Sequence, residues 1–187
     1  GDHVVGIDIK DGLDCRDFFK SCYEKFDLVV HLAAIVGGRE MIENEPLAVA
    51  TDLSIDSEMF NWAVRTKQEK IIYAYPIKYQ KRNSNVKMEE SFIDLNNISN
   101  PDFTYGWSKL TGELLADFAK KLGVKVYIFR PFSGFGENQD LTYPIPSFIN
   151  RVINKVEEFE IWGDGNQVRD FIYIEDDILL LADVSVD

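Results

Sequence analysis

The sequence predicts an α/β fold in which helices cover both faces of a parallel sheet. Short apolar segments alternate along the chain with amphipathic segments of helical period, a pattern typical of strand–helix–strand units. The apolar segments are continuous, as expected for strands that are buried on both faces. The expected strands are 4–9, 27–34, 70–74 and 124–129.

The expected helices occupy the intervals between these strands. Residues 15–26 and 46–65 carry aromatic and aliphatic side chains at helical spacing. A third helix extends from Tyr105 to Leu122 and ends there because Gly123 is a favourable residue just beyond a helix. Residues 80–104 are polar and predict a loop.

The composition excludes several classes of protein. The chain has 187 residues, of which 45% are hydrophobic, so it can bury a core and is not a disordered chain. The net charge of −12 argues against a nucleic-acid partner, which needs a basic surface, and against an anionic membrane surface. No apolar segment approaches the roughly 18 residues of a membrane span.

The cysteines and the opening residues bear on the cellular compartment. Cys15 and Cys22 are too few for a disulfide framework and predict two free thiols in a reducing environment. The chain opens on Gly1-Asp2-His3, which does not resemble a signal peptide. We therefore expect a cytoplasmic protein, and we expect no metal site.

Tyr105 and Lys109 form the first candidate site. Side chains four residues apart on a helix lie on the same face, one turn from each other. An ammonium group beside a phenol favours the phenolate and lowers the pKa of the phenol from about 10. Such a tyrosine can exchange a proton with a substrate hydroxyl during hydride transfer. The alternative is a surface pair without a role.

Asp8 is the second candidate because it lies at the end of the first expected strand. In a dinucleotide-binding fold, a carboxylate at this point binds both ribose hydroxyls of the adenosine and disfavours a 2′-phosphate, which selects NAD over NADP. The alternative is an ordinary turn residue.

Two further segments contain residues suited to a ligand. Arg169 follows the tight turn Gly163-Asp-Gly165, and its planar guanidinium group suits a diphosphate; the alternative is an ion pair with Asp170 or Glu175. The segment Arg130–Gly136 leaves a buried strand with small residues that let the backbone approach a ligand at the carboxyl end of the sheet.

The order and spacing of these elements closely resemble the extended short-chain dehydrogenase/reductase family, and within it the NAD-dependent nucleotide-sugar epimerases and dehydratases. The resemblance covers essentially the whole chain. It implies a Rossmann-like doubly wound parallel sheet, truncated at both ends. The elements that carry it are Asp8 after a strand, His31-Leu-Ala-Ala34, Tyr105-x-x-x-Lys109, Arg130-Pro131, and Gly163-Asp-Gly…Arg169-Asp-Phe…Asp176-Asp177.

The resemblance assigns the catalytic base to Tyr105, while Lys109 lowers its pKa and holds the nicotinamide ribose. It implies NAD as cofactor and residues 1–131 as an incomplete NAD-binding domain. The remaining residues implied to contact NAD are Asp8 at the adenosine ribose, Asp14 and Cys15 at the adenine, Leu32, Ala33 and Ala34 along the cofactor, and Pro131 near the nicotinamide.

The resemblance also implies a nucleotide-diphosphate sugar as substrate. Its binding residues would be Gly37, Gly38 and Arg39 in a sugar-facing loop, Ser133 where many members carry an asparagine, and Arg169 at the diphosphate. Residues 132–187 would then combine part of a small substrate-binding region with returning sheet elements. Members usually form homodimers through the helix that carries the tyrosine, and we expect the same here.

Two family elements are not found in the sequence. The resemblance predicts a Gly-x-x-Gly-x-x-Gly loop before Gly1 and a serine-rich stretch between Ala74 and Tyr75. The glycine loop places the cofactor pyrophosphate at a helix N-terminus, so without it we expect weak NAD binding. A non-catalytic relative that binds a nucleotide sugar is therefore the rival hypothesis.

The sequence favours one reaction within the family. A 4,6-dehydratase needs a carboxylate beside the serine stretch, and Tyr75-Pro76-Ile77 offers none. A 3,5-epimerase needs a cysteine and a lysine, which are found neither near Ala74 nor within Gly136–Pro146. We therefore expect a 4-epimerase or 4-ketoreductase that oxidises the sugar transiently at C4, with the dehydratase and the 3,5-epimerase as alternatives.

Overall fold

The computed structural model describes residues 3–35, 39–74, 103–161, 164, 166 and 170–185. These residues form two compact units: those up to Arg130 belong to the first unit, and those from Pro131 onward belong to the second. The domain boundary expected from the sequence stays a prediction.

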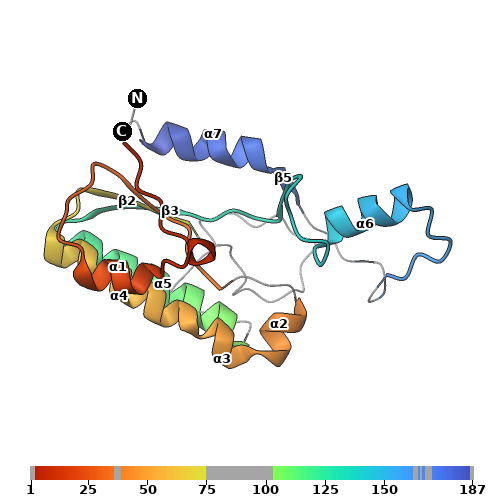
Figure 1. The fold of residues 1–187 in the computed structure, drawn as a ribbon, viewed down its shortest axis with the longest axis horizontal. Coiled ribbons are helices and arrows are strands. Elements are labelled where there is room, and N and C mark those ends of the chain that lie inside the picture. Colours follow the sequence, from red (N-terminus) through yellow and green to blue (C-terminus); the bar gives the residue numbers. More distant parts are fainter. Residues whose placement is uncertain are drawn as a thin grey trace. The chain divides into compact units, whose positions relative to one another are not determined.

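A three-stranded parallel sheet organises the first unit (Figure 1). Its strands are β1 (Val29–His31), β2 (Lys70–Ala74) and β3 (Lys125–Phe129), and they lie in this order. Strand β2 pairs in parallel with both neighbours, with Ile71 opposite Val29 on one side and Val126 on the other. The predicted α/β fold with a parallel sheet is confirmed.

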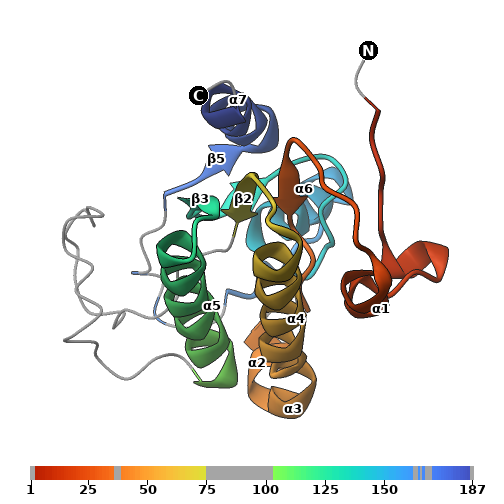
Figure 2. The ribbon, with the colours of Figure 1, turned by 90° about the vertical axis from the view of Figure 1, so that its left-hand side faces the viewer.

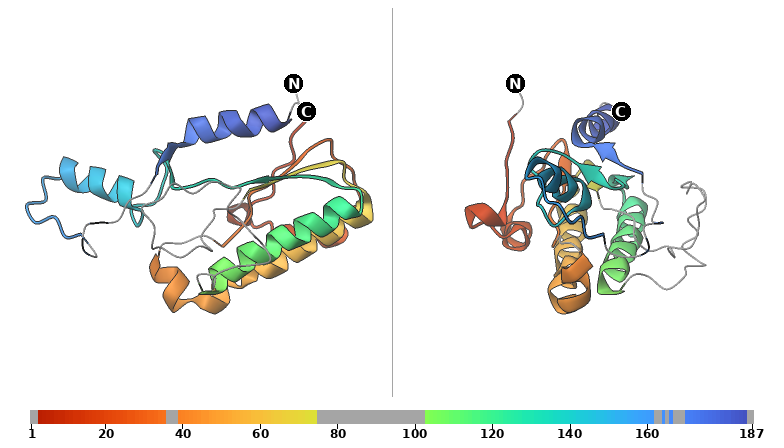
Figure 3. Two further views of the ribbon diagram at one scale, coloured as in Figure 1. Left: turned by 180° about the vertical axis from the view of Figure 1, so that it is seen from behind. Right: turned by 90° about the vertical axis from the view of Figure 1, so that its right-hand side faces the viewer.

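Five α-helices lie among the described residues of the first unit. Helices α4 and α5 lie side by side along one face of the sheet (Figures 2 and 3), and α4 also packs against α1. The five are α1 (Cys15–Ser21), α2 (Arg39–Asn44), α3 (Pro46–Val49), α4 (Thr51–Thr66) and α5 (Phe103–Lys121).

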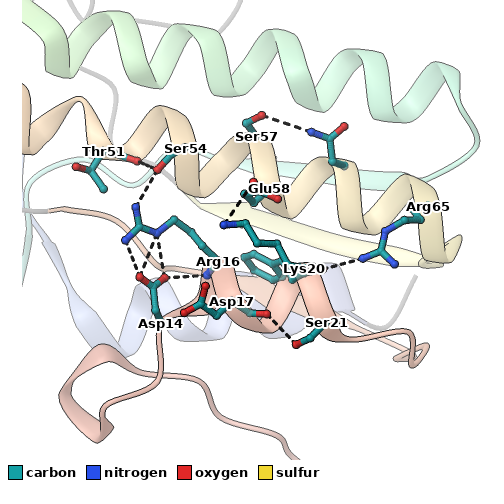
Figure 4. A network of polar contacts seen from close by, with 12 residues as sticks. Asp14, Arg16, Asp17, Lys20, Ser21, Thr51, Ser54, Ser57, Glu58 and Arg65 are labelled. Atoms are coloured by element: carbon teal, nitrogen blue, oxygen red, sulfur yellow. Dashed lines mark hydrogen bonds and ion pairs between the residues drawn. The ribbon is translucent and has the colours of Figure 1, made fainter.

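Aromatic and polar contacts join α1 to α4. The ring of Trp62 on α4 lies 5.2 Å from the ring of Phe19 and 6.0 Å from that of Phe18. At the polar edge of the same contact, Arg65 donates a hydrogen bond to the Phe19 carbonyl oxygen and Arg16 donates one to Ser54 (Figure 4). Helix α4 is therefore held between α1 and α5.

The first expected strand is absent from the described structure. The segment around Val4 is exposed and has no regular secondary structure, and it leads into a short 3-10 helix, η1 (Ile9–Asp11). Val4 is 83% exposed and Ile9 is 69% exposed, so the prediction of a buried strand over 4–9 was wrong. A strand needs a partner for its backbone hydrogen bonds, and this segment has none in the described sheet.

Two other expected elements are shorter than predicted. The helix expected over 15–26 ends at Ser21, and the strand expected over 27–34 is confined to Val29–His31. Helix α4 begins after a break at Ala50, which separates it from α3. The strands expected over 70–74 and 124–129 and the helix expected over 105–122 agree with β2, β3 and α5 to within two residues.

The described residues of the second unit form a two-stranded parallel sheet and two α-helices. Strand β4 (Gly134–Phe135) pairs with β5 (Ile172–Tyr173). Helix α6 (Pro144–Ile153) lies between these strands in the sequence, and α7 (Ile174–Ser185) follows β5 directly. Within the described residues of either unit, no helix is both long enough and apolar enough to cross a membrane.

Candidate active site

Tyr105 and Lys109 lie on the first half of α5 and are both buried. Tyr105 is 4% exposed and Lys109 is 2% exposed. The Lys109 ammonium nitrogen lies 5.5 Å from the centre of the Tyr105 ring. The pair is therefore not the surface pair that was the alternative interpretation, and the positive charge lies close enough to act on the phenol.

A buried carboxylate on α4 binds the Lys109 ammonium. Lys109 Nζ donates to Asp52 Oδ2 at 2.7 Å, and Asp52 is 1% exposed. The other oxygen of this carboxylate, Oδ1, accepts the backbone N–H of Ile35 at 2.6 Å. One side chain on α4 thus contacts both α5 and the segment that follows β1.

A second carboxylate lies one turn further along α4. Asp56 Oδ2 accepts the Tyr73 hydroxyl at 2.5 Å, and Asp56 Oδ1 lies 3.2 Å from His31 Nε2. The rings of His31 and Tyr73 are stacked, with centres 5.8 Å apart. Burial, followed by the nearby Asp56 charge, raises the pKa of Tyr73 far above its usual value, so this tyrosine stays a hydrogen-bond donor.

The close approach of α5 to β2 requires a glycine at position 112. A Cβ atom there would overlap the Tyr73 hydroxyl and lie 2.7 Å from Asp56 Oδ2. One residue further on, Glu113 is 1% exposed and accepts a hydrogen bond from Arg130 Nε at 2.5 Å. Helix α5 therefore presents Lys109, Gly112 and Glu113 on the face that packs toward the sheet and α4.

The residues expected to line the cofactor leave the carboxyl end of β1. Leu32 is 62% exposed, whereas Ala33 and Ala34 are half-buried. The next residue, Ile35, is the one whose N–H is bound by Asp52. These small side chains thus lie in a segment attached to the same carboxylate as Lys109.

Asp8, Asp14 and Cys15 have local structural partners. Asp8 is exposed and caps η1 by accepting the Lys10 N–H at 2.9 Å. Asp14 caps α1 and pairs with the Arg16 guanidinium group at 2.6 Å, and this hydrogen bond lowers the pKa of Asp14 to about 2. Burial raises the pKa of the Cys15 thiol, and both cysteines are free.

The second unit contains two of the expected site residues. Pro131 and Ser133 are half-buried, and Ser133 has a φ of 35°, which is strained for a residue other than glycine. Beside Gly134, the residue after Ser133, lies the Asp177 carboxylate of α7, which is 6% exposed; burial raises its pKa. The roles of Pro131 and Ser133 stay predictions.

Several expected substrate residues lie outside the described part of the chain. Gly37, Gly38 and Arg169 are not described, and neither is the segment 75–102 that contains Tyr75-Pro76-Ile77. Arg39 begins α2, and its backbone alone is described. In the described residues, no group of three or more histidine, cysteine or acidic side chains could hold a metal ion.

Sequence reasoning missed most of the polar network around Lys109. Asp52 was left without a role, and Asp56 and Glu113 were not singled out. A signal was available: Asp52 and Asp56 are four residues apart on one helix, as are Lys109 and Glu113 on the other. Charged residues at the spacing of a buried helical face predict a buried ionic network.

A parallel sheet covered by helices defines a Rossmann-like α/β protein, and the buried tyrosine–lysine pair one turn apart is the candidate site that the sequence predicts. Residues 1–182 match the sequence model of the NAD dependent epimerase/dehydratase family. The chain belongs to this family.

Curated relatives and solved structures agree with this assignment. A putative UDP-glucose 4-epimerase from Methanocaldococcus jannaschii is 30% identical over 183 residues, which cover 92% of this chain and 55% of the relative. A dTDP-4-dehydro-6-deoxy-D-allose reductase from a Streptomyces species is 26% identical over 179 residues, with the same coverage. The chain therefore spans about half the length of the curated relatives it matches.

Among solved structures, a UDP-glucuronic acid 4-epimerase from Bacillus cereus, in complex with UDP-glucuronic acid and NAD, is similar to this chain. It has a TM-score of 0.71 and is 26% identical, and the match covers 91% of this chain and 51% of the epimerase. The relatives include a putative epimerase and a reductase, so the family is established and the reaction is left open.

Proposed function

We propose that the full-length protein is an NAD-dependent nucleotide-sugar 4-epimerase in which Tyr105 is the catalytic base. The observation that carries the proposal is the buried pair on α5, in which the Lys109 ammonium lies 5.5 Å from the Tyr105 ring. A buried cation favours the phenolate of a neighbouring tyrosine. Tyr105 would take the proton from the C4 hydroxyl of the sugar as the hydride leaves C4, and would return a proton to the same oxygen when the hydride is delivered to the opposite face of the rotated 4-keto sugar.

The described residues fit a nicotinamide cofactor. Leu32 presents an exposed apolar side chain at the carboxyl end of β1, and Ala33 and Ala34 leave room for a ligand to approach the backbone. Lys109 would hold the nicotinamide ribose, and the exposed carboxylate of Asp8 would bind the adenosine ribose. When bound, NAD supplies the acceptor for the hydride that leaves C4 of the sugar and, as NADH, the donor that returns a hydride to the same carbon.

A 4-epimerase is favoured because this reaction requires fewer catalytic side chains than 4,6-dehydration or 3,5-epimerisation. The reaction needs the tyrosine base, the lysine that favours its phenolate, a serine or threonine at the reacting hydroxyl and a sugar that can rotate between the two hydride transfers. The UDP-glucuronic acid 4-epimerase and the putative UDP-glucose 4-epimerase among the relatives support this reaction. We further propose Ser133 and Arg169 as contacts of the sugar and the diphosphate, with Gly37, Gly38 and Arg39 at the sugar.

A homodimer is proposed on the exposed face of α5. Trp107 is 54% exposed, Leu114 is 42% exposed and Phe118 is 59% exposed. Their spacing of seven and then four residues places all three on one side of the helix, opposite Tyr105 and Lys109. An apolar stripe of this kind is typical of a helix–helix interface.

The proposal is tested by incubating the purified full-length protein with UDP-glucose, UDP-N-acetylglucosamine and UDP-glucuronic acid in D2O. Hydride return to the same carbon predicts the 4-epimer without deuterium in the sugar. Deuterium at C3 or C5 would instead indicate a 3,5-epimerase, and a 4-keto-6-deoxy product would indicate a dehydratase. Products are identified by proton NMR.

The variant Tyr105→Phe decides the role of the base. We expect turnover to fall by at least about 100-fold while NAD binding is retained, because only the proton-transferring hydroxyl is lost. Tyr23→Phe is the control, since Tyr23 is 75% exposed. Unchanged turnover in Tyr105→Phe contradicts the mechanism. Binding of a nucleotide sugar without turnover by the wild type would instead indicate a non-catalytic relative.

A further inference from the structure

Two side chains that face each other across the sheet share one carboxylate of α4. His31 and Tyr73 are opposite each other in the register of β1 and β2, and their rings are stacked with centres 5.8 Å apart. Asp56 Oδ1 lies 3.2 Å from His31 Nε2, and Asp56 Oδ2 accepts the Tyr73 hydroxyl at 2.5 Å. All three side chains are almost completely buried. We call these three side chains the Asp56 bridge, because they join α4 to both strands.

The chemistry of the Asp56 bridge fixes which groups donate. An ionised carboxylate only accepts hydrogen bonds. Burial, followed by the Asp56 charge, raises the pKa of Tyr73 far above its usual value, so the hydroxyl keeps its proton and donates. The His31 nitrogen that faces Asp56, Nε2, must carry a proton as well, because two acceptors would otherwise be buried against each other. Both strands therefore donate to one side chain of the helix.

The Asp56 bridge lies at the carboxyl ends of the two strands. His31 is the last residue of β1, and Tyr73 is the last but one of β2. In open parallel α/β sheets, ligands bind beyond the carboxyl ends of the strands. Residues 32–34, which are proposed to line NAD, begin directly after His31. The bridge thus fixes the point at which this segment leaves the sheet.

We propose that Asp56 is a positioning residue for NAD, because its two carboxylate oxygens hold His31 and Tyr73, and with them the carboxyl ends of β1 and β2. This inference rests on the proposed function in that residues 32–34 are taken to line the cofactor. Asp56 acts only through the strands, since it is 3% exposed and both of its oxygens bind side chains of the sheet. A segment already held in place loses less freedom when a ligand binds, so the bridge acts on NAD affinity and not on the hydride step.

The hydrogen-bond pattern is tested by NMR without cofactor. In the full-length protein labelled with 15N-histidine, long-range proton–nitrogen spectra show which ring nitrogens carry a proton, and the His31 signals are those lost in His31→Gln. We expect a slowly exchanging Nε2–H signal from His31 that disappears in Asp56→Leu. The exposed His3 is the internal control and should give no slowly exchanging signal. A His31 ring that carries its only proton on Nδ1 overturns the proposal.

The functional consequence is read from NAD binding by calorimetry. Asp56→Leu keeps the branched shape of the side chain but removes both acceptors, and the NAD dissociation constant is expected to rise about tenfold, with kcat at saturating NAD near the wild-type value. Met59→Ala is the matched control. Met59 is 0% exposed on the same helix, so its truncation destabilises the fold but removes neither hydrogen bond, and NAD affinity should not change.

Two outcomes of the binding experiment overturn the positioning role of Asp56. One is an unchanged NAD dissociation constant in Asp56→Leu. The other is equal weakening of NAD binding in Asp56→Leu and Met59→Ala, which would show that lower stability alone is responsible. If the wild type binds NAD but turns over no nucleotide sugar, the proposed function fails, whereas the dissociation constants still test the Asp56 bridge.

A loss of folding in Asp56→Leu is resolved by a double variant. Asp56→Leu/Tyr73→Phe also removes the buried hydroxyl that would face the leucine. We expect the double variant to unfold at a higher temperature than Asp56→Leu and to bind NAD as weakly, because the bridge is absent from both. A double variant that is no more stable than Asp56→Leu, or that binds NAD as tightly as the wild type, overturns the proposal.

Discussion

Gly112 allows the most direct test of how α5 packs on the sheet. A Cβ atom at this position would overlap the Tyr73 hydroxyl and lie 2.8 Å from Cζ of the same ring and 2.7 Å from Asp56 Oδ2. Tyr73 is 1% exposed and Asp56 is 3% exposed, so neither side chain can move into solvent. Gly112→Ala must therefore break the hydrogen bond from Tyr73 to Asp56 or displace the helix.

The cost of Gly112→Ala can be worked out from three contributions. Losing a buried hydrogen bond to a charged group costs about 1.5–3 kcal/mol, and overpacking costs about 1–3 kcal/mol. Alanine returns about 1 kcal/mol through its higher helix propensity. The expected net loss in the free energy of unfolding is about 3 kcal/mol, measured by urea denaturation.

The controls separate packing from helix propensity. Thr111→Ala changes the adjacent residue on the outer side of α5 and should alter stability by no more than about 0.5 kcal/mol. Tyr73→Phe removes the same hydrogen bond, so its cost should not add fully to that of Gly112→Ala. A stabilisation by Gly112→Ala of about 1 kcal/mol, as in an open helix, would refute the packing argument.

Two further predictions concern the charge and the surface of the first unit. The Arg16 hydrogen bond lowers the pKa of Asp14 from 3.8 to about 2 in the folded protein. Asp14 therefore stabilises the fold above pH 4, and this contribution is lost as the pH falls from about 4 to 2. Asp14→Asn should remove that part of the pH dependence of the unfolding temperature; the same difference in unfolding temperature between pH 5 and pH 2 in the variant and the wild type would contradict the prediction. Phe118→Asp places a charge on the exposed apolar face of α5 and should convert the proposed dimer to a monomer in light scattering, whereas Tyr23→Asp should not; a monomeric wild type would rule out the interface.

The sequence determined the class of fold and placed Tyr105 and Lys109 together. Strands β2 and β3 are continuous apolar segments that contain β-branched and aromatic residues. Helix α5 has apolar residues at regular helical spacing, and this spacing stops before Gly123. Local preference and burial agree in these elements, so their positions could be predicted closely. The tyrosine–lysine spacing by itself placed Tyr105 and Lys109 on one face of a helix.

The tertiary structure decided which polar residues surround that pair. Asp52 is 57 residues from Lys109 and 17 residues from Ile35, and nothing in local sequence fixes a hydrogen bond over such distances. The segment at 4–9 also shows that local sequence is not sufficient. Its apolar residues suit a strand, but it pairs with no strand of the described sheet. Spacing predicts which residues share a face, whereas burial and pairing depend on the elements that pack against that face.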